Sequence, residues 1–478
     1  MIRFAFAMML FGSVAAKAQS IDVAPPGPVL AGDAVSIKLA GMPANSNVTV
    51  SAQRLLNSGA KRVLYRAEAV YETGADGSLD MSAAMPSSGS YRGADVRGLF
   101  WSMVPSQATP PAELAPEQVL LVAQVDGKTV AKTIVQFVNT LPSVKVEVVD
   151  AFPGAVLAMM PGAQRQPVVI VLGGSEGGAS AVRQMALNLG ARGFAALGLP
   201  YYSPAAWSSP VRELPSLPQS FVDIPVDRLQ AVHAWLLKRG DVDASRIGVL
   251  GVSKGAEFAL IAASKMPWIR SVAAIVPSDV VWQGWGPDVI PPDSMRSSFS
   301  FGGKALPFVP NKDFFEEMAG FRTGADVRYR RAYDKGRAAF PAAAVAARIR
   351  VEDFKGPLLV AGGIEDQMWA SGAMVQNIVE RRVEAKLETV ALIFTDAGHM
   401  LSGTGWSPTT QYDAGPFKTG GTPAANAKAQ AEVWQATLSF LARTLASGSA
   451  GLPVLKNKQV QRPAGQALPL KRNTQLAV

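Results

Sequence analysis

The 478-residue sequence contains no cysteine and only two histidines, His233 and His399. The first absence excludes disulfide scaffolds, cysteine-ligated zinc sites and cysteine nucleophiles, and a chain of this length buries enough apolar surface to fold without cross-links. The second leaves two candidates for any mechanism that needs an imidazole base. We expect neither a metal nor an organic cofactor.

Long apolar runs and blocks of like charge are also missing. Beyond the N-terminus no stretch reaches 18 uninterrupted apolar residues, so we expect no stable membrane span in the mature chain. Lys and Arg outnumber Asp and Glu by 46 to 37, but they are scattered singly, which argues against a nucleic-acid partner. The expected partner is a small-molecule substrate, and the sequence does not indicate an oligomeric state.

The N-terminus differs from the rest of the chain. Arg3 is followed by an apolar run over 4–16 and by the small-x-small pattern of Ala16, Lys17 and Ala18. This pattern predicts a signal peptide over residues 1–18, and therefore an exported protein that is periplasmic or secreted. An apolar helix over 4–16 rises about 20 Å, which is too short for the roughly 30 Å hydrocarbon core. A buried N-terminal helix is the alternative.

The remaining sequence divides by its hydrophobic pattern. Residues 23–141 contain short alternating runs separated by turn residues, which predict a small all-β sandwich. Residues 142–446 alternate strands with amphipathic helices and predict an α/β domain, with an insertion at about 282–347 where Gly, Pro and aromatic residues interrupt the alternation. Residues 447–478 are expected to form a basic flexible tail.

The α/β part contains eight candidate strands, at 144–149, 155–160, 168–172, 194–199, 247–250, 272–276, 358–361 and 391–394. Helices are expected at 181–192, 223–238 and 424–445. This count predicts an α/β-hydrolase fold, with a mostly parallel eight-stranded sheet and helices on both faces, preceded by the smaller β-sandwich.

Two segments match the G-x-S-x-G pattern, 173–177 (GGSEG) and 251–255 (GVSKG). Ser253 follows the fifth strand, where an α/β-hydrolase places its nucleophile. Ser175 follows the third strand, where the same fold places the loop that supplies half of the oxyanion hole. We therefore predict Ser253 as the nucleophile and regard Ser175 as a polar residue of a glycine-rich turn.

The base and the acid are sought after the last strands. His399 follows the eighth strand and is the predicted base, whereas His233 lies inside a helix and is expected to be a buried or half-buried packing residue. Asp366 follows the seventh strand and is the predicted acid. Glu365 is the second choice, and Asp396 is a third that is better explained as a turn cap. The chain order Ser, Asp, His is that of α/β-hydrolases.

The expected oxyanion donors are main-chain groups, the N–H of Lys254 and an N–H of Gly174 or Ser175. We expect the Lys254 side chain to be solvated, with contact to an anionic substrate as the alternative. Glu257, in the first turn of the following helix, is explained by interaction with the helix dipole, with a functional role as the alternative.

At these residues the sequence resembles the acyl-CoA thioesterase and bile acid-CoA:amino acid N-acyltransferase family. In the second half the similar segments are 251–257 (GVSKGAE), 362–371 (GGIEDQMWAS), the His399 loop and 420–431 (GGTPAANAKAQA). In the first half 89–93 (GSYRG) and 98–103 (GLFWSM) are similar to the signature of the family's N-terminal β-sandwich. The resemblance covers most of residues 23–445.

The resemblance implies a triad of Ser253, Asp366 and His399, with acyl-CoA as the donor and water or an amino acid as the acceptor. The leading hypothesis is a serine hydrolase of acyl thioesters or esters that works through an acyl-enzyme. Transfer to an amine is one alternative, and because CoA thioesters are not expected outside the cytoplasm, an exported carboxylesterase is another. A binding module without catalysis, in which the β-sandwich recruits a partner, is the alternative from another class.

Overall fold

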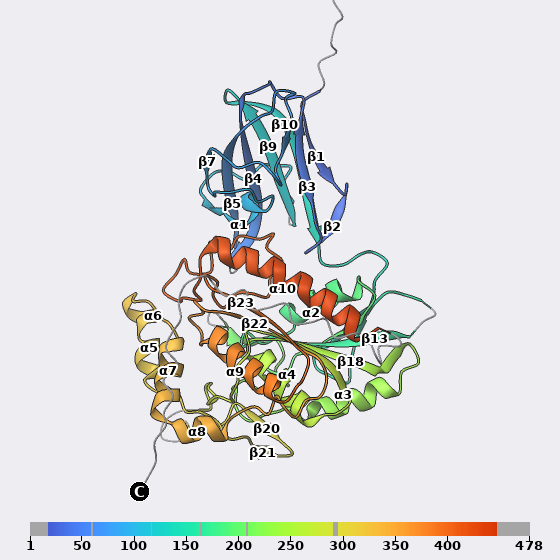
Figure 1. The fold of residues 1–478 in the computed structure, drawn as a ribbon, viewed down its shortest axis with the longest axis vertical. Coiled ribbons are helices and arrows are strands. Elements are labelled where there is room, and N and C mark those ends of the chain that lie inside the picture. The colour runs from blue at the N-terminus through green and yellow to red at the C-terminus, as the bar shows by residue number, and fades with distance from the viewer. Residues whose placement is uncertain are drawn as a thin grey trace, which may run out of the picture.

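The computed structural model describes residues 18–58, 61–115, 117–162, 165–206, 209–289 and 295–446. The predicted signal peptide lies outside the described residues except for Ala18, and the predicted tail lies wholly outside them. A smaller part made of strands stands on a larger part in which helices surround a sheet, and one long helix runs along the boundary (Figure 1).

Two sheets pack face to face in the smaller part. The first consists of β1 (Ser20–Ala24), β3 (Ser36–Ala40) and β6 (Leu79–Asp80). The second runs in the order β2 (Pro28–Leu30), β10 (Lys128–Val138), β9 (Gln118–Val125), β4 (Asn47–Ser58), β5 (Lys61–Glu72) and β7 (Ser88–Gly89), with β8 (Val104–Ser106) paired to β5. Inward-facing residues of both sheets share one core with the short helix α1 (Gly98–Trp101). The predicted β-sandwich is therefore present.

The larger part is built on one eight-stranded sheet. Its order is β11 (Lys145–Val148), β12 (Val156–Met159), β14 (Ala195–Gly198), β13 (Gln166–Leu172), β18 (Val242–Val252), β19 (Ile269–Ile275), β22 (Leu358–Gly363) and β23 (Thr389–Phe394). The pairs β11–β12 and β12–β14 are antiparallel, and all later pairs are parallel. The eight predicted strands and the α/β-hydrolase fold class are confirmed.

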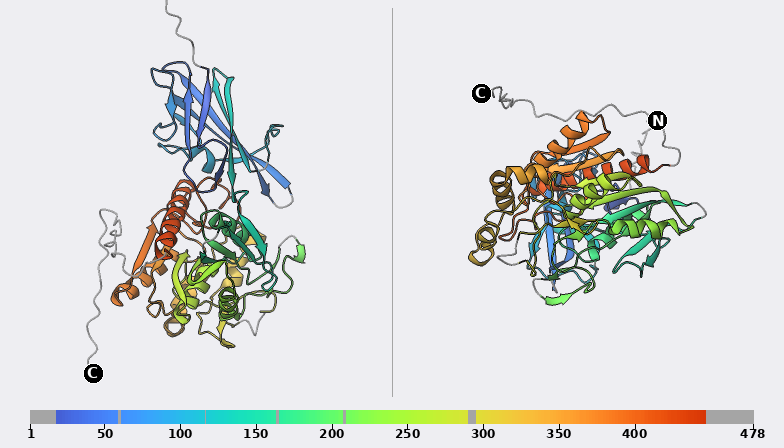
Figure 2. Two further views of the ribbon diagram at one scale, coloured as in Figure 1. Left: turned by 90° about the vertical axis from the view of Figure 1, so that its right-hand side faces the viewer. Right: turned by 90° about the horizontal axis from the view of Figure 1, so that it is seen from below.

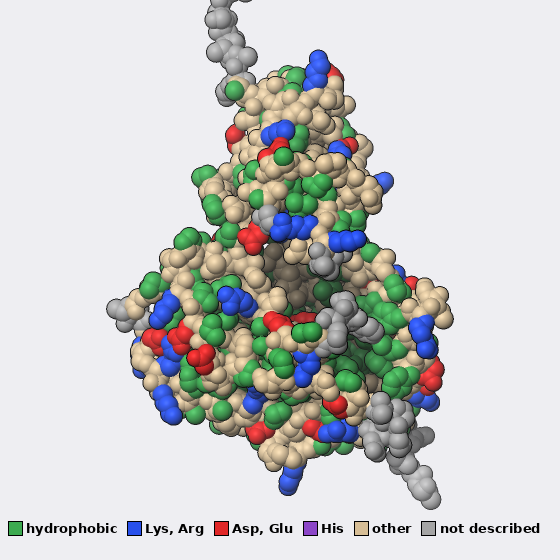
Figure 3. Space-filling model, turned by 180° about the vertical axis from the view of Figure 1, so that it is seen from behind, with side chains coloured by type: hydrophobic (Ala, Val, Ile, Leu, Met, Phe, Trp, Pro, Cys, Tyr) green, Lys and Arg blue, Asp and Glu red, His purple; other side chains and the backbone are tan. Residues whose placement is uncertain are grey.

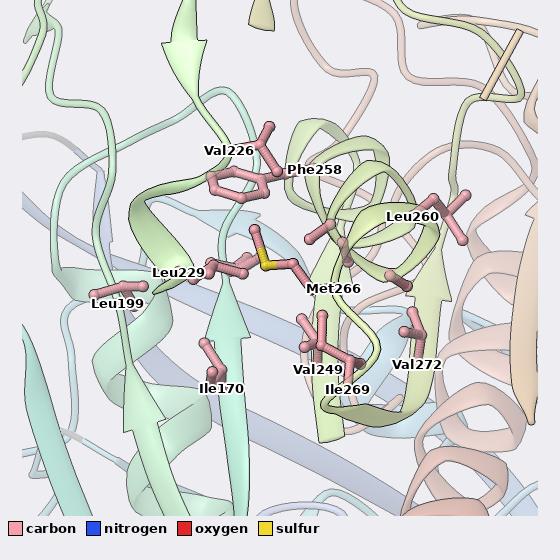
Figure 4. Packing of buried hydrophobic residues seen from close by; sticks show 14 of the residues in the cluster. Ile170, Leu199, Val226, Leu229, Val249, Phe258, Leu260, Met266, Ile269 and Val272 are labelled. Atoms are coloured by element: carbon pink, nitrogen blue, oxygen red, sulfur yellow. The ribbon is translucent and has the colours of Figure 1, made fainter. Parts of the chain in front are cut away.

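Helices cover both faces of this sheet, which explains why its central strands are continuous apolar runs. Side chains on one face pack with α2 (Ser180–Gly190) and α10 (Pro423–Thr444). Those on the other face, including Ile170, Val249 and Val272, pack with α3 (Arg228–Leu237), α4 (Lys254–Lys265) and α9 (Ser371–Glu384), as Figure 4 shows around α4.

The predicted helix over 223–238 begins later than expected, at Arg228. Ile224 and Pro225 instead form β17, which pairs with β20 (Phe299–Phe301). The difference has a local cause, because the residue that precedes a proline is pushed away from the helical region toward an extended conformation.

The segment between β19 and β22 forms a separate layer beside the sheet. It contains β20, β21 (Lys304–Ala305), α5 (Phe314–Met318), α6 (Gly320–Thr323), α7 (Arg330–Ala339) and α8 (Pro341–Ala346), and the helices α5 to α8 lie together at one side of the sheet (Figure 1). A shorter hairpin, β15 (Ala205–Ala206) and β16 (Ser209–Arg212), follows β14. Within the described ranges no helix is both long and apolar enough to cross a membrane.

The two parts contact each other through α10, α2 and the loop after β23. Arg192 binds Asp33 across the boundary at 2.6 Å, and Gln435 Nε2 donates to the carbonyl oxygen of Gly32 at 2.6 Å. Figure 2 shows the smaller part standing on the end of the larger part at which α10 begins. On the face of the molecule that is hidden in Figure 1, a hollow lies where the two parts meet (Figure 3).

Candidate active site

Ser253 occupies a sharp turn between β18 and α4. Its backbone has φ 55° and ψ −118°, a left-handed conformation that a residue with a side chain seldom adopts. A Cβ at Gly251 would overlap the carbonyl oxygen of Gly255, and a Cβ at Gly255 would overlap the carbonyl oxygens of Leu172 and Gly173. Gly251 is therefore required for β18 to pass close to the start of α4, and Gly255 for α4 to pack against the end of β13, which explains the G-x-S-x-G spacing.

The structure brings three of the predicted side chains into one hydrogen-bonded row. His399 Nε2 lies 2.9 Å from Ser253 Oγ, and His399 Nδ1 lies 2.8 Å from Asp366 Oδ2. All three residues are buried. An ionised carboxylate only accepts hydrogen bonds, so the neutral imidazole carries its proton on Nδ1 and presents an unprotonated Nε2 to the serine.

The loop after β22 and the helix α7 both hold Asp366. Asp366 Oδ1 accepts the main-chain N–H groups of Met368 and Trp369 at 2.8 and 3.3 Å. Arg330, from α7, donates to the Asp366 carbonyl oxygen at 3.0 Å. The two other candidate acids, Glu365 and Asp396, are exposed. Asp366 is therefore the carboxylate that the fold aims at His399.

His233 is far from this row in the fold, half-buried in α3. Its ring stacks on Trp268 with centroids 4.4 Å apart and an angle of 9° between the planes. Burial lowers the pKa of the His233 imidazole, which favours the neutral ring in this apolar contact. The expected packing role of His233 agrees with this position.

The predicted oxyanion donors lie beside Ser253, and one of them is already occupied. A Cβ at Gly174 would lie 3.3 Å from Ser253 Cβ, so the turn after β13 approaches Ser253 closely. The Gly174 N–H donates to Glu176 Oε1 at 2.9 Å. The N–H groups of Lys254 and Ser175 have no acceptor within the described residues. The exposed Glu176 carboxylate therefore occupies one predicted anion-binding position.

The Lys254 side chain is buried, so the expectation that it is solvated is wrong. Its Nζ donates to Glu257 Oε2 at 2.6 Å and to Ser298 Oγ at 3.0 Å. Four aromatic rings surround the ammonium group at 5.0 to 5.9 Å, those of Phe221, Trp285, Phe299 and Trp369. The segment after β19, together with Phe221 before α3 and Trp369 after β22, encloses a side chain that a solitary helix would leave in water.

Glu257 is also buried, and its carboxylate binds a second segment of the chain in addition to lying in the first turn of α4. Its Oε1 accepts the main-chain N–H of Trp282 at 3.2 Å, so the carboxylate joins α4 to the start of the segment that follows β19. Burial raises the pKa of the Glu257 carboxyl, and the Lys254 ammonium opposes that rise. Burial also lowers the pKa of Lys254, which Glu257 opposes in turn.

Several contacts of the site had no clear signal in the sequence. Arg330 is one arginine among many, and Lys254 and Glu257 are recognisable as an i, i+3 pair but not as a buried one. Asn426 and Gln430, four residues apart in α10, contact the His399 loop. Within the described ranges no three His, Asp or Glu residues are grouped so that they could hold a metal ion.

Comparisons with known proteins match both parts of the chain. The family model described as BAAT / acyl-CoA thioester hydrolase C terminal matches residues 229–447, and the acyl-CoA thioester hydrolase/BAAT N-terminal region matches residues 32–153. Acyl-coenzyme A thioesterase 6 of Mus musculus is 24% identical over 443 residues, which cover 90% of this chain and 97% of the relative. Acyl-coenzyme A amino acid N-acyltransferase 2 of Rattus norvegicus is 26% identical over 443 residues, 88% of this chain and 97% of the relative.

Among solved structures, the acylaminoacyl peptidase of Pyrococcus horikoshii is similar with a TM-score of 0.37 and 10% identity. The match covers 88% of this chain and 63% of that one.

Proposed function

This chain belongs to the acyl-CoA thioester hydrolase/BAAT family, and from that premise we propose that it is a serine-dependent hydrolase of acyl thioesters or esters. The observation that supports the proposal most strongly is the row of hydrogen bonds from Asp366 through His399 to Ser253. In this proposal the enzyme works through an acyl-enzyme, and the predicted signal peptide exports it to the periplasm or the medium.

The first half-reaction is acylation. Ser253 Oγ attacks the acyl carbonyl carbon while its proton passes to His399 Nε2, and Asp366 stabilises the resulting imidazolium through Nδ1. The tetrahedral intermediate collapses when His399 returns that proton to the leaving sulfur or oxygen. The products are a free thiol or alcohol and an ester on Ser253.

The negative charge that develops on the carbonyl oxygen needs hydrogen-bond donors. The Lys254 N–H is unoccupied among the described residues, and the Gly174 N–H becomes available when the Glu176 carboxylate leaves it. Loss of one such donor typically costs about 2.7 to 4 kcal/mol of transition-state stabilisation. In this proposal the substrate carbonyl displaces Glu176, whose exposed side chain swings into solvent.

The second half-reaction releases the acyl group. His399 takes a proton from water, the water oxygen attacks the acyl carbon, and collapse returns the proton to Ser253 and frees the carboxylic acid. Transfer to an amino acid is the second candidate, because one relative is named as an amino acid N-acyltransferase. If the protein is exported, a carboxylester without CoA becomes the more accessible substrate.

The test is a panel of acyl-CoA thioesters and nitrophenyl esters with the wild type and Ser253→Ala. We expect the wild type to cleave at least one chain-length class and to be labelled by a fluorophosphonate, and the variant to do neither. Full activity of Ser253→Ala, or a wild type that neither cleaves nor takes the label, contradicts the proposal. Added glycine or taurine that speeds thiol release and yields an amide would identify the amine as acceptor.

A further inference from the structure

Helix α10 presents two buried amide side chains to the loop that carries His399. Asn426 and Gln430 are one turn apart on the same face of the helix. A buried amide requires partners for both its oxygen and its nitrogen, because an unpaired polar group in the interior is costly. The partners of both amides lie in the loops around His399.

Asn426 binds the residue before the histidine. Its Oδ1 accepts the Gly398 N–H at 2.8 Å, and its Nδ2 donates to the carbonyl oxygen of Gly420 at 3.0 Å. A Cβ at Gly421 would lie 2.6 Å from Asn426 Oδ1, so the glycine gives the amide room to reach the loop. Asn426 thus joins the His399 loop, at Gly398, to the segment that leads into α10, at Gly420.

Gln430 binds the residue after the histidine. Its Nε2 donates to the carbonyl oxygen of Met400 at 2.8 Å and to the Tyr412 hydroxyl at 3.0 Å. Its Oε1 accepts the Gly405 N–H at 3.3 Å. Gln430 therefore holds the start of the loop and a point five residues further along it.

Together the two amides hold the peptide groups on both sides of His399. The His399 N–H itself donates to the carbonyl oxygen of Thr419 at 2.9 Å, which supports the backbone from a third direction. The imidazole must reach Ser253 on one side and Asp366 on the other within normal hydrogen-bond distance, so a small shift of its backbone breaks both contacts.

We propose that Asn426 and Gln430 are positioning residues for His399, which act on catalysis through the geometry of the loop and not by touching the substrate. This inference rests on the proposed function, because it assumes that His399 is the base. Misplacement of a catalytic group by about 1 Å can cost about 100-fold in rate, so each alanine variant is expected to lose about 10- to 100-fold in kcat with little change in KM.

The experiment compares Asn426→Ala and Gln430→Ala with Asn188→Ala in the full chain. Asn188 is a buried amide in α2 that donates to the carbonyl oxygen of Ala31, away from the His399 loop, and its Oδ1 has no partner among the described residues. Urea unfolding measures the stability of all three, and kcat and KM are measured with the best ester of the substrate panel. We expect Asn188→Ala to lose less stability than the two α10 variants, because fewer hydrogen bonds are removed, and we expect a loss of kcat only in the two α10 variants.

The second readout is spectroscopic and does not depend on turnover. Because the chain has two histidines, selective ¹⁵N-histidine labelling yields two imidazoles, and His233 serves as the internal reference. In the wild type the Nδ1 proton of His399, bound to Asp366, is expected as a separate low-field resonance. It should shift or broaden in the two α10 variants while the His233 signals stay unchanged.

A conservative variant keeps the test valid if an alanine variant fails to fold. Asn426→Asp retains an acceptor for the Gly398 N–H but loses the donor to the Gly420 carbonyl oxygen, so it is expected to recover part of the kcat that Asn426→Ala loses. The proposal is overturned if both α10 alanine variants keep the kcat of Asn188→Ala, or if kcat falls while the His399 resonance stays in place. Full activity of Ser253→Ala would instead refute the proposed function, and the spectra would still show whether the amides position the histidine.

Discussion

Replacement of Lys254 by methionine should destabilise the protein through the carboxylate that it leaves behind. Methionine fills a similar volume among the four aromatic rings, so the change removes the charge with little loss of packing. Glu257 would keep the Trp282 N–H as a hydrogen-bond donor but lose its 2.6 Å contact with the ammonium group.

The expected magnitude follows from the burial of both groups. Lys254 is 1% exposed and Glu257 is 0% exposed, and removal of one partner from such a pair typically costs about 3 to 5 kcal/mol of unfolding free energy. The double variant Lys254→Met/Glu257→Gln removes both charges, and the glutamine oxygen still accepts the Trp282 N–H. The unfolding free energy of the double variant should therefore lie within about 1 kcal/mol of that of the wild type, because replacement of a buried ion pair as a whole is often neutral.

The assay is urea unfolding of wild type, both single variants and the double variant, at pH 5 and pH 8. Burial holds the pKa of Glu257 above its ordinary value, and loss of Lys254 removes the charge that opposes this rise. A carboxyl whose folded-state pKa is raised binds more protons in the folded state, so its stabilising contribution is lost as pH rises. The loss of unfolding free energy in Lys254→Met, relative to the wild type, should therefore be larger at pH 8 than at pH 5.

Lys265→Met is the matched control, since Lys265 lies on the same helix over the ring of Phe301 but is exposed. It should change the unfolding free energy by less than about 1 kcal/mol at either pH. A deficit of Lys254→Met no larger than that of the control would refute the argument from burial. If the double variant lost as much unfolding free energy as the two single variants together, the stability of Lys254 and Glu257 would not be coupled as a pair.

Three further predictions concern the site and its supports. His399→Ala should lower kcat by about 10³-fold or more while His233→Ala stays within about tenfold, as steady-state assays would show; the reverse would contradict the assigned base. Glu176→Ala should raise kcat/KM, because it frees the Gly174 N–H for the substrate, whereas a large fall in kcat would mean that the carboxylate takes part in the reaction. Trp406→Ala should lower the unfolding free energy, measured with urea, by about 3 to 5 kcal/mol. The Trp406 ring packs in the core of the β-sandwich, where its centroid lies 4.9 Å from that of Phe100 and 5.1 Å from that of Phe137. An unfolding free energy like that of the wild type would show that the β-sandwich does not hold this loop.

The strand count in the sequence was sufficient for the fold class. Continuous apolar runs mark strands covered on both faces, and glycines two before and two after Ser253 mark a turn at which backbones cross closely. Both signals are local, because they depend on periodicity and on the absence of a side chain. The start of α3 was missed because Pro225 extends the chain before Arg228.

The environment of Lys254 and Glu257 had no such signal. Their spacing is that of an ordinary surface pair on a helix, and the sequence therefore predicts a solvated lysine. A segment that begins at Trp282, 25 residues after Glu257, and reaches Ser298, 44 residues after Lys254, covers them. The rings of Phe221 and Trp369, from two other parts of the chain, complete the enclosure. Burial of a side chain is decided by whichever distant segment covers it.

The sequence by itself determined the order of strands and the loops in which a nucleophile, an acid and a base could stand, because period and glycine spacing are properties of neighbouring residues. Only the tertiary structure decided which side chains meet. It set the 2.9 Å contact between His399 and Ser253, 146 residues apart, and the hold of α10 on the His399 loop. Those contacts arise where separate elements pack together, and packing depends on the whole chain.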